Sequence, residues 1–321
     1  LLERLDHNEG LCQAVAAFFP LPQALYHFSG FANGRLVPEG WRARKRPLAW
    51  QPVAGTPRPR IDCAAVRFEG GDRVLFAGGC GDHPARVSTF YNDAVLYDSL
   101  RDEWETLPPM LYRRHGCSGA LLEGRVYVVG GNYVEQASGN PDGCFAEAFD
   151  LAEQVWSRVP LLSECPAPVH WHSADAFVPV AALQGRIVVA CCRSGAAPDP
   201  WSMRVFWPRR PDLGWMPGGV PDKAGSPTSP STEPFEPMRK TPASTTVGRY
   251  LVVASGRQCN PCSAEAFTFT WVPREQADGT LLLVNEASGE EKDCTTLQRQ
   301  ELWQLLTAGL WWRLPDLNAR R

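Results

Sequence analysis

The sequence lacks an excess of basic charge. Its 321 residues include 32 Lys and Arg against 35 Asp and Glu, which gives a formal net charge of -3. Nucleic-acid binders gather Lys and Arg where they meet phosphates. The dense basic run of this chain consists of Arg42, Arg44, Lys45 and Arg46. We interpret that run as a solvated loop and expect no nucleic-acid partner.

A long apolar segment is also missing. The longest apolar stretch, residues 11–28, is interrupted by Gln13, Pro20, Pro22 and Gln23. A bilayer-spanning helix needs about 20 consecutive, mainly apolar residues, so we expect no membrane segment. Because the chain begins with leucine and not methionine, we expect a fragment or a processed product.

Compact disulfide spacing is absent as well. The 11 cysteines are an odd number, and several lie in apolar, strand-like runs. This usage favours a reducing compartment, and we expect a cytoplasmic protein. The pair Cys259 and Cys262 has zinc-knuckle spacing but no second pair, and His170 and His172 have no identifiable third ligand. We therefore expect no metal and no cofactor.

Common catalytic fingerprints do not occur. The sequence has no GxSxG, P-loop, HExxH or Rossmann pattern. Glycine pairs do occur, but they end apolar runs and do not open helices. They are poor candidates for phosphate binding, so the question becomes what a strand gains by ending in two glycines.

Those glycine pairs belong to an internal repeat. VLFAGG ends at Gly79 and VYVVGG ends at Gly131, and in both cases a tryptophan, Trp104 or Trp156, follows 25 residues later. An aromatic residue, Tyr97 or Phe149, precedes each tryptophan by seven positions. Each unit of about 50 residues holds four short alternating apolar runs, which is typical of one β-propeller blade.

Weaker copies lie on both sides of these two units. GRIVVACC (185–192) and GRYLVVASG (248–256) occupy the same place in the repeat without the full glycine pair. ALYHFSG (24–30) precedes Trp50, a candidate outer-strand tryptophan. LWWRLPDLN (310–318) has the pattern of an outer strand, and we expect it to complete the blade that begins near ALYHFSG and so close the ring.

The combination of apolar strand, Gly-Gly, variable loop, Tyr/Phe-Asp and a tryptophan seven positions later resembles the kelch repeat. Residues 60–162 match this pattern most specifically. The resemblance implies an all-β fold, a kelch-type β-propeller of four-stranded blades. Length divided by repeat predicts six blades, some of them degenerate.

We expect a single domain over residues 1–321. Residues 217–242 are rich in Pro, Ser and Thr and predict a mobile loop between blades. Leucines at helical spacing predict a helical insertion over residues 294–306. The residues assigned to repeat structure are Gly78, Gly79, Tyr97, Trp104, Gly130, Gly131, Phe149 and Trp156.

Loops that follow the glycine pairs and loops that join blades should emerge at one end of the ring. Binding residues concentrate on such loops, because a rigid scaffold presents them. The candidate partner-binding residues are Arg86, Tyr91, Arg114, Tyr133, Glu135, Arg193, Trp201 and Arg257. Arginines and aromatics around one opening suit an acidic or phosphorylated peptide.

The resemblance implies a protein-protein interaction module, an adaptor for ubiquitin ligases or a cytoskeletal scaffold, although no BTB or F-box segment is recognisable. The alternative is an enzyme, because some kelch-like propellers are copper oxidases and others modify sugars. A copper radical site requires two tyrosines, two histidines and a cysteine beside one tyrosine. His170 and His172 cannot be combined with Tyr91 or Tyr97 into such a set, so the interaction module is preferred.

Overall fold

The structure is a computed structural model, and it describes most of the chain. The described residues are 24–32, 35–44, 49–68, 70–81, 89–132, 146–159, 180–190, 203–218, 243–254 and 264–313.

Five antiparallel sheets follow one another along the chain. The first has three strands, β1 (Ala24–Ala32), β2 (Arg35–Arg44) and β3 (Trp50–Val53). The second contains β4 (Ala64–Arg67), β5 (Arg73–Ala77), β8 (Ala94–Asp98) and β9 (Glu103–Leu107). The third contains β10 (His115–Leu122), β11 (Arg125–Asn132), β12 (Ala146–Asp150) and β13 (Val155–Arg158).

The last two sheets repeat the same up-and-down order. The fourth contains β14 (Val180–Leu183), β15 (Arg186–Ala190), β16 (Met203–Phe206) and β17 (Trp215–Gly218), with a 3-10 turn, η1 (Pro211–Leu213), before β17. The fifth contains β18 (Ala243–Val247), β19 (Tyr250–Ala254), β20 (Ala264–Phe269) and β24 (Gly309–Arg313). A small hairpin of β6 (Cys80–Gly81) and β7 (Thr89–Phe90) lies in the loop between β5 and β8.

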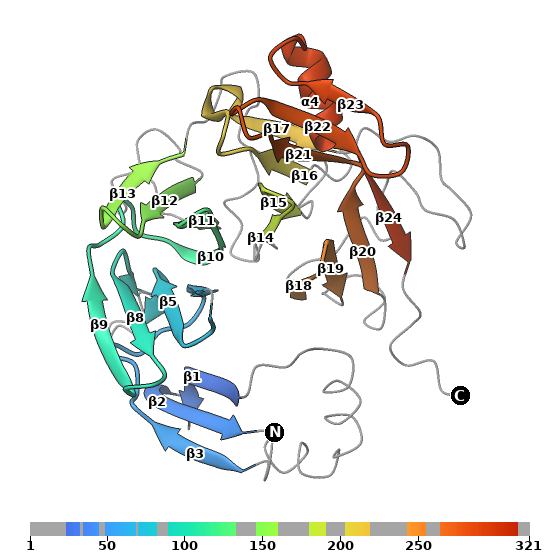
Figure 1. The fold of residues 1–321 in the computed structure, drawn as a ribbon. Coiled ribbons are helices and arrows are strands. Elements are labelled where there is room, and N and C mark those ends of the chain that lie inside the picture. The colour runs from blue at the N-terminus through green and yellow to red at the C-terminus, as the bar shows by residue number, and fades with distance from the viewer. Residues whose placement is uncertain are drawn as a thin grey trace, which may run out of the picture.

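The sheets are arranged as blades around an axis, as Figure 1 shows from blue to red. The first strands of the second to fifth sheets, β4, β10, β14 and β18, contact one another in succession, so they are the innermost strands. Each later strand of a sheet lies farther out. The fold is therefore all-β and of the propeller type. The described residues form five blade sheets, and the expectation of six blades stays a prediction.

The repeated aromatics fill the space between the outer strands of a blade. In four sheets a residue of the third strand lies directly opposite a tryptophan of the fourth, with ring centroids 5.0 to 5.3 Å apart. These pairs are Tyr97 and Trp104, Phe149 and Trp156, Phe206 and Trp215, and Phe267 and Trp311. Aromatic pairs of this kind stabilise neighbouring strands beyond their buried area. In the first sheet Ala43 lies opposite Trp50.

The expected closure at the C-terminus is wrong for the strand that carries Trp311. β24 pairs with β20 and completes the fifth sheet, with Trp311 opposite Phe267. It does not pair with the first sheet, where the described neighbours of β2 are β1 and β3. β24, the fourth strand of the fifth blade, is thus separated from β20 by a long insertion. Because of this separation, the pairing could not be recognised from the sequence.

The insertion lies between β20 and β24 and has structure of its own. It contains β21 (Trp271–Glu275), β22 (Leu281–Asn285), β23 (Glu291–Asp293) and the helix α4 (Arg299–Thr307). The helix expected over residues 294–306 thus begins five residues later than predicted, because residues 294–296 form a turn after β23. Leu283, Leu302 and Leu306 share one buried cluster with residues of the fourth and fifth blades.

Candidate functional site

The glycine pairs mark where the second strand of a blade meets the connection from the previous blade. Gly78 and Gly79 have φ values of 69° and 97°, and Gly130 and Gly131 have 71° and 93°. Glycine adopts this region of φ without steric cost. A Cβ at Gly78 would lie 2.7 Å from the carbonyl oxygen of Arg114. The glycines therefore permit both the turn and the close approach of the next connection.

A buried arginine braces each of these junctions. Arg60, in the connection before β4, donates from Nη1 to the carbonyl of Gly78 at 3.1 Å and from Nη2 to Asp93 Oδ2 at 2.6 Å. One side chain thus ties the incoming connection to the end of β5 and to the start of β8. Charge-assisted bonds of this kind are among the stronger hydrogen bonds in proteins.

Arg114 repeats this arrangement one blade later. It donates from Nη1 to the carbonyl of Gly130 at 2.9 Å and from Nε to Glu147 Oε1 at 2.8 Å. The side chains of Arg114 and Glu147 are 1% and 0% exposed. The backbone N–H of Leu111 donates to the second oxygen of Glu147 at 2.6 Å. Arg114 was expected to face a partner from the surface. Its burial gives it a structural role instead.

Tyr91 is also covered. It was expected as an exposed loop aromatic, but it is 8% exposed. The guanidinium carbon of Arg58 lies 4.6 Å from the centroid of its ring, and that of Arg60 lies 5.6 Å from it. Arg58 itself is exposed. The tyrosine therefore serves as a platform that holds Arg58 at the surface, a cation-π arrangement.

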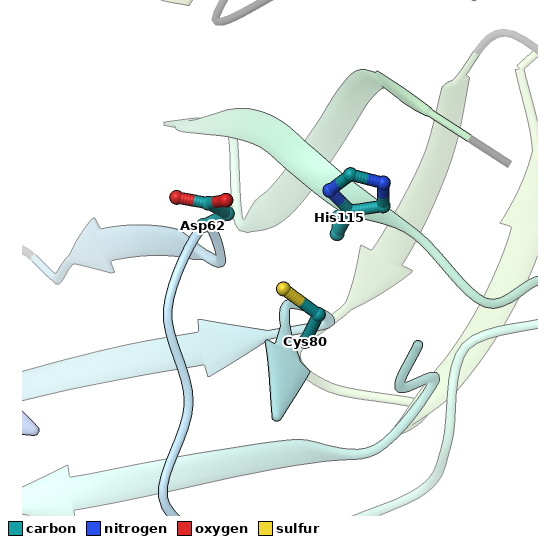
Figure 2. Close-up of side chains that lie close together, drawn as sticks. All are labelled: Asp62, Cys80 and His115. Carbon is teal, nitrogen blue, oxygen red and sulfur yellow. The ribbon is translucent and has the colours of Figure 1, made fainter. Parts of the chain in front are cut away.

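Three side chains that can bind a metal meet beside these braces (Figure 2). Asp62 lies just before β4, Cys80 opens the loop after the glycine pair, and His115 begins β10. Each contributes one ligand atom, and these atoms all lie within 4.8 Å of one another. The ring of Phe90 stacks on the imidazole of His115, with centroids 4.1 Å apart. Residues from three separate segments of two blades thus converge on one point.

Burial governs the ionisation of this cluster. It lowers the pKa of His115 from its ordinary value, while the nearby Asp62 carboxylate acts in the opposite direction. Burial raises the pKa of Asp62, and His115 partly offsets that change. A neutral imidazole is the form that binds metal ions.

The remaining candidate binding residues lie outside the described residues. They are Arg86, Tyr133, Glu135, Arg193, Trp201 and Arg257, together with the cysteine pair at 259–262, the histidines at 170 and 172, and residues 219–242 of the expected loop. Their assignments stay predictions.

Sequence reasoning did not single out Arg60, Asp62 or Cys80. A signal for Arg60 was present, because R-x-x-C occurs at residues 60–63 and again at residues 114–117, 15 and 13 residues before the two glycine pairs. In the structure each of these arginines braces the corresponding glycine pair. No spacing in the sequence points to the Asp62 and Cys80 side chains, since they meet only when the ring forms.

Comparison with known proteins agrees with this architecture. No protein-family model matches the chain. The solved structure of YjhT superposes with a TM-score of 0.52 at 12% sequence identity, covering 85% of this chain and 95% of that one. A likeness at this identity shows the fold, which is that of a β-propeller.

Relatives by sequence carry the kelch repeat. F-box/kelch-repeat protein At1g26930 of Arabidopsis thaliana is 31% identical over 115 residues, 36% of this chain and 26% of that protein. Kelch-like protein 25 of Mus musculus is 33% identical over 112 residues, 34% of this chain and 18% of that protein. Kelch repeat and BTB domain-containing protein 12 of Danio rerio is 32% identical over 100 residues, 29% of this chain and 15% of that protein.

With the glycine pairs and aromatic pairs of the blades, these relatives identify the chain as a kelch-repeat β-propeller. The matched stretches make up only 26% or less of the length of these three relatives. Among the described residues, no helix is long and apolar enough to cross a membrane.

Proposed function

We propose that this chain is a protein-interaction module that binds a protein or peptide partner at the end of the ring where the blade connections emerge. As part of a longer protein it would act as an adaptor or scaffold, recruiting a substrate to a ubiquitin ligase. The names of the relatives, which combine kelch repeats with F-box or BTB segments, support this role.

The observation that carries the proposal is the rigid anchoring of the blade connections. Arg60 fixes one connection to Gly78 and Asp93, and Arg114 fixes the next to Gly130 and Glu147. A fixed connection loses little conformational entropy when it binds, which favours recognition by a preorganised surface. Binding residues on rigidly held loops are common in proteins that recognise other proteins.

Positive charge at the same connections supports an acidic or phosphorylated partner. Arg58 precedes the brace residue Arg60, and Arg113 precedes the brace residue Arg114; both Arg58 and Arg113 are exposed. Guanidinium groups bind carboxylates and phosphates in bidentate fashion. Arg86, Tyr133, Glu135, Arg193, Trp201 and Arg257 belong to this proposal as residues predicted from the sequence.

The test compares a double charge reversal with a matched control. In affinity purification from cell extract followed by mass spectrometry, we expect Arg58→Glu combined with Arg113→Glu to lose the proteins that the wild type retains. Both positions are exposed, so the melting temperature should change little. Arg274→Glu, on the exposed side of the inserted strand β21, should retain the same proteins.

Binding is then measured with a retained partner in purified form. We expect the affinity to fall as salt rises, because exposed charge pairs are screened. Retention of all partners by the double variant would refute the assignment of the binding end.

A cytoplasmic location is part of this proposal, since 11 cysteines without compact disulfide spacing suit a reducing compartment.

A further inference from the structure

We propose that Asp62, Cys80 and His115 form a zinc-binding site at the loop end of the ring. A carboxylate oxygen, a thiolate sulfur and an imidazole nitrogen are the three donor types that bind Zn²⁺ in proteins. Their ligand atoms lie within 4.8 Å of one another, and Figure 2 shows the three side chains close together. This site does not depend on the proposed partner binding, so either could fail without the other.

The backbone holds the three segments together before any ion binds. Ile61 and Cys80 exchange two hydrogen bonds, of 3.0 and 2.9 Å. The N–H of Gly79 donates to the carbonyl of Arg114 at 2.7 Å, and the N–H of Gly116 donates to the carbonyl of Asp62 at 2.7 Å. Backbone hydrogen bonds thus connect each of the three segments that carry Asp62, Cys80 and His115 to the other two. A site on such a fixed junction loses little entropy on binding.

Asp62 occupies a backbone position where the next repeat has a glycine. Residues 60–63 and 114–117 occupy equivalent places, since Cys63 and Cys117 contact Gly79 and Gly131 in the same way. Asp62 therefore corresponds to Gly116, and their φ values are 58° and 67°. One repeat has glycine at this left-handed position, and aspartate is among the residues that adopt it most readily. Asp102, Glu123, Gln154 and Gln184 also have positive φ. What distinguishes Asp62 is the approach of its carboxylate to the ligand atoms of Cys80 and His115.

The donor set selects zinc over the alternatives. Mg²⁺ and Ca²⁺ prefer oxygen ligands alone, whereas a mixed sulfur, nitrogen and oxygen set suits Zn²⁺. A tetrahedral zinc ion with bonds of about 2.0–2.3 Å holds its donor atoms roughly 3.5 Å apart. Because the donor atoms lie within 4.8 Å of one another, they must approach by no more than about 1.3 Å. Three protein ligands leave a fourth position for water or for a donor group from a partner.

Cobalt(II) reports on such a site directly, because a tetrahedral Co²⁺ thiolate complex absorbs in the visible and shows a sulfur-to-metal charge-transfer band. We expect the reduced, metal-free chain to bind a single equivalent of Co²⁺ with both features, and Zn²⁺ to displace it. Cys80→Ser should abolish the charge-transfer band. His115→Ala should weaken Zn²⁺ binding by more than the 10- to 100-fold that the loss of a ligand's supporting partner typically causes. His27→Ala, at an exposed position in β1, should bind as the wild type does.

Asp62→Gly keeps the test decisive if the other variants fold poorly. It installs the residue that the next repeat uses at the same backbone position, so we expect it to fold and to lose Zn²⁺ affinity by a similar factor. A wild-type chain with no thiolate charge-transfer band would overturn the proposal. Undiminished Zn²⁺ binding by the folded Asp62→Gly variant would overturn it as well, because the ion would then be held elsewhere.

Discussion

Arg114 Nε lies 2.8 Å from Glu147 Oε1, and both side chains are buried. The pair joins the connection that enters the third blade to the third strand of that blade. Arg60 and Asp93 form the corresponding pair one blade earlier, at 2.6 Å, with the carboxylate partly exposed. A buried charge with its partner in place can be neutral for stability, whereas a buried charge without a partner is very costly. Removing one partner of the Arg114–Glu147 pair should therefore cost more stability than removing both, and this difference can be measured.

We expect Arg114→Met to lower the free energy of unfolding by about 3–5 kcal/mol, because Glu147 would keep a buried charge without its partner. Glu147→Leu should have a similar effect. The double variant should lose much less than the sum of the two, since neither charge remains. Urea unfolding of the four proteins gives the coupling energy.

The surface pair Arg125 and Asp150 is the matched control, with Arg125 Nε 3.0 Å from Asp150 Oδ2 and its side chain 53% exposed. Arg125→Met should change stability by less than about 1 kcal/mol. Equal effects at Arg114 and Arg125 would show that the buried brace has no special role.

Trp156 anchors the third blade to the connection that enters it. Its ring packs 5.0 Å from that of Phe149, and its indole N–H donates to the carbonyl of Pro108 at 2.8 Å. Trp156→Ala should cost roughly 3–5 kcal/mol in the free energy of unfolding. Val155→Ala, at the neighbouring exposed position, should cost less than about 1 kcal/mol. Thermal and urea unfolding measure both. A small effect at Trp156 would contradict its assignment to the blade core.

The repeat features were predictable because they are local. A glycine pair with positive φ and a tryptophan seven residues after an aromatic are fixed within one blade, so residue type and spacing reveal them. The burial of Arg114 was not predictable, because it depends on Glu147, 33 residues away. The pairing of β24 with β20 was hidden for the same reason, since the inserted β21 to α4 segment separates the two strands.

The proposed metal-binding cluster could not be predicted from the sequence either. Asp62, Cys80 and His115 lie in three separate segments, and their separations in the sequence match no short metal-binding motif. They are brought together by backbone hydrogen bonds between two blades. A sequence search for zinc sites instead finds Cys259 and Cys262, whose spacing is local.

Arg186 is a buried charge that forms no ion pair with a carboxylate among the residues that the structure describes. In the third blade Arg125 lies opposite Asp150, but the residue that follows Phe206 is Trp207. Arg186 donates to the carbonyl of Trp271 and lies 4.0 Å from the ring centroid of Phe269. Its Nε and Nη1 have no hydrogen-bond partner among the described residues.

Burial lowers the pKa of Arg186 from 12.5 to about 9. The unfolded chain therefore binds the proton more tightly, and the cost of the buried charge is fully present below pH 9. We expect Arg186→Met to raise the free energy of unfolding at pH 7 by about 1 kcal/mol or more. The advantage of the variant should shrink as the pH rises above 9.

Chemical unfolding at pH 7 and pH 10 tests this prediction, with the exposed Arg73→Met as control. The control should show little difference from the wild type at either pH. Strong destabilisation by Arg186→Met at pH 7 would mean that the bond to Trp271 and the stacking on Phe269 outweigh the desolvation of the charge.

Leu306 tests whether the insertion is part of the propeller core. It lies on α4, is fully buried, and belongs to the same cluster as Met216 of β17 and Leu251 of β19. If the insertion and these blades unfold as a unit, Leu306→Ala should lower the melting temperature of the whole chain, at a cost of about 2–5 kcal/mol. Leu100→Ala, at a position 77% exposed, should have little effect. Tryptophan fluorescence and far-UV circular dichroism should then report one shared transition. A separate early transition in the Leu306 variant, with the main transition unmoved, would instead make the insertion an independent unit docked on the blades.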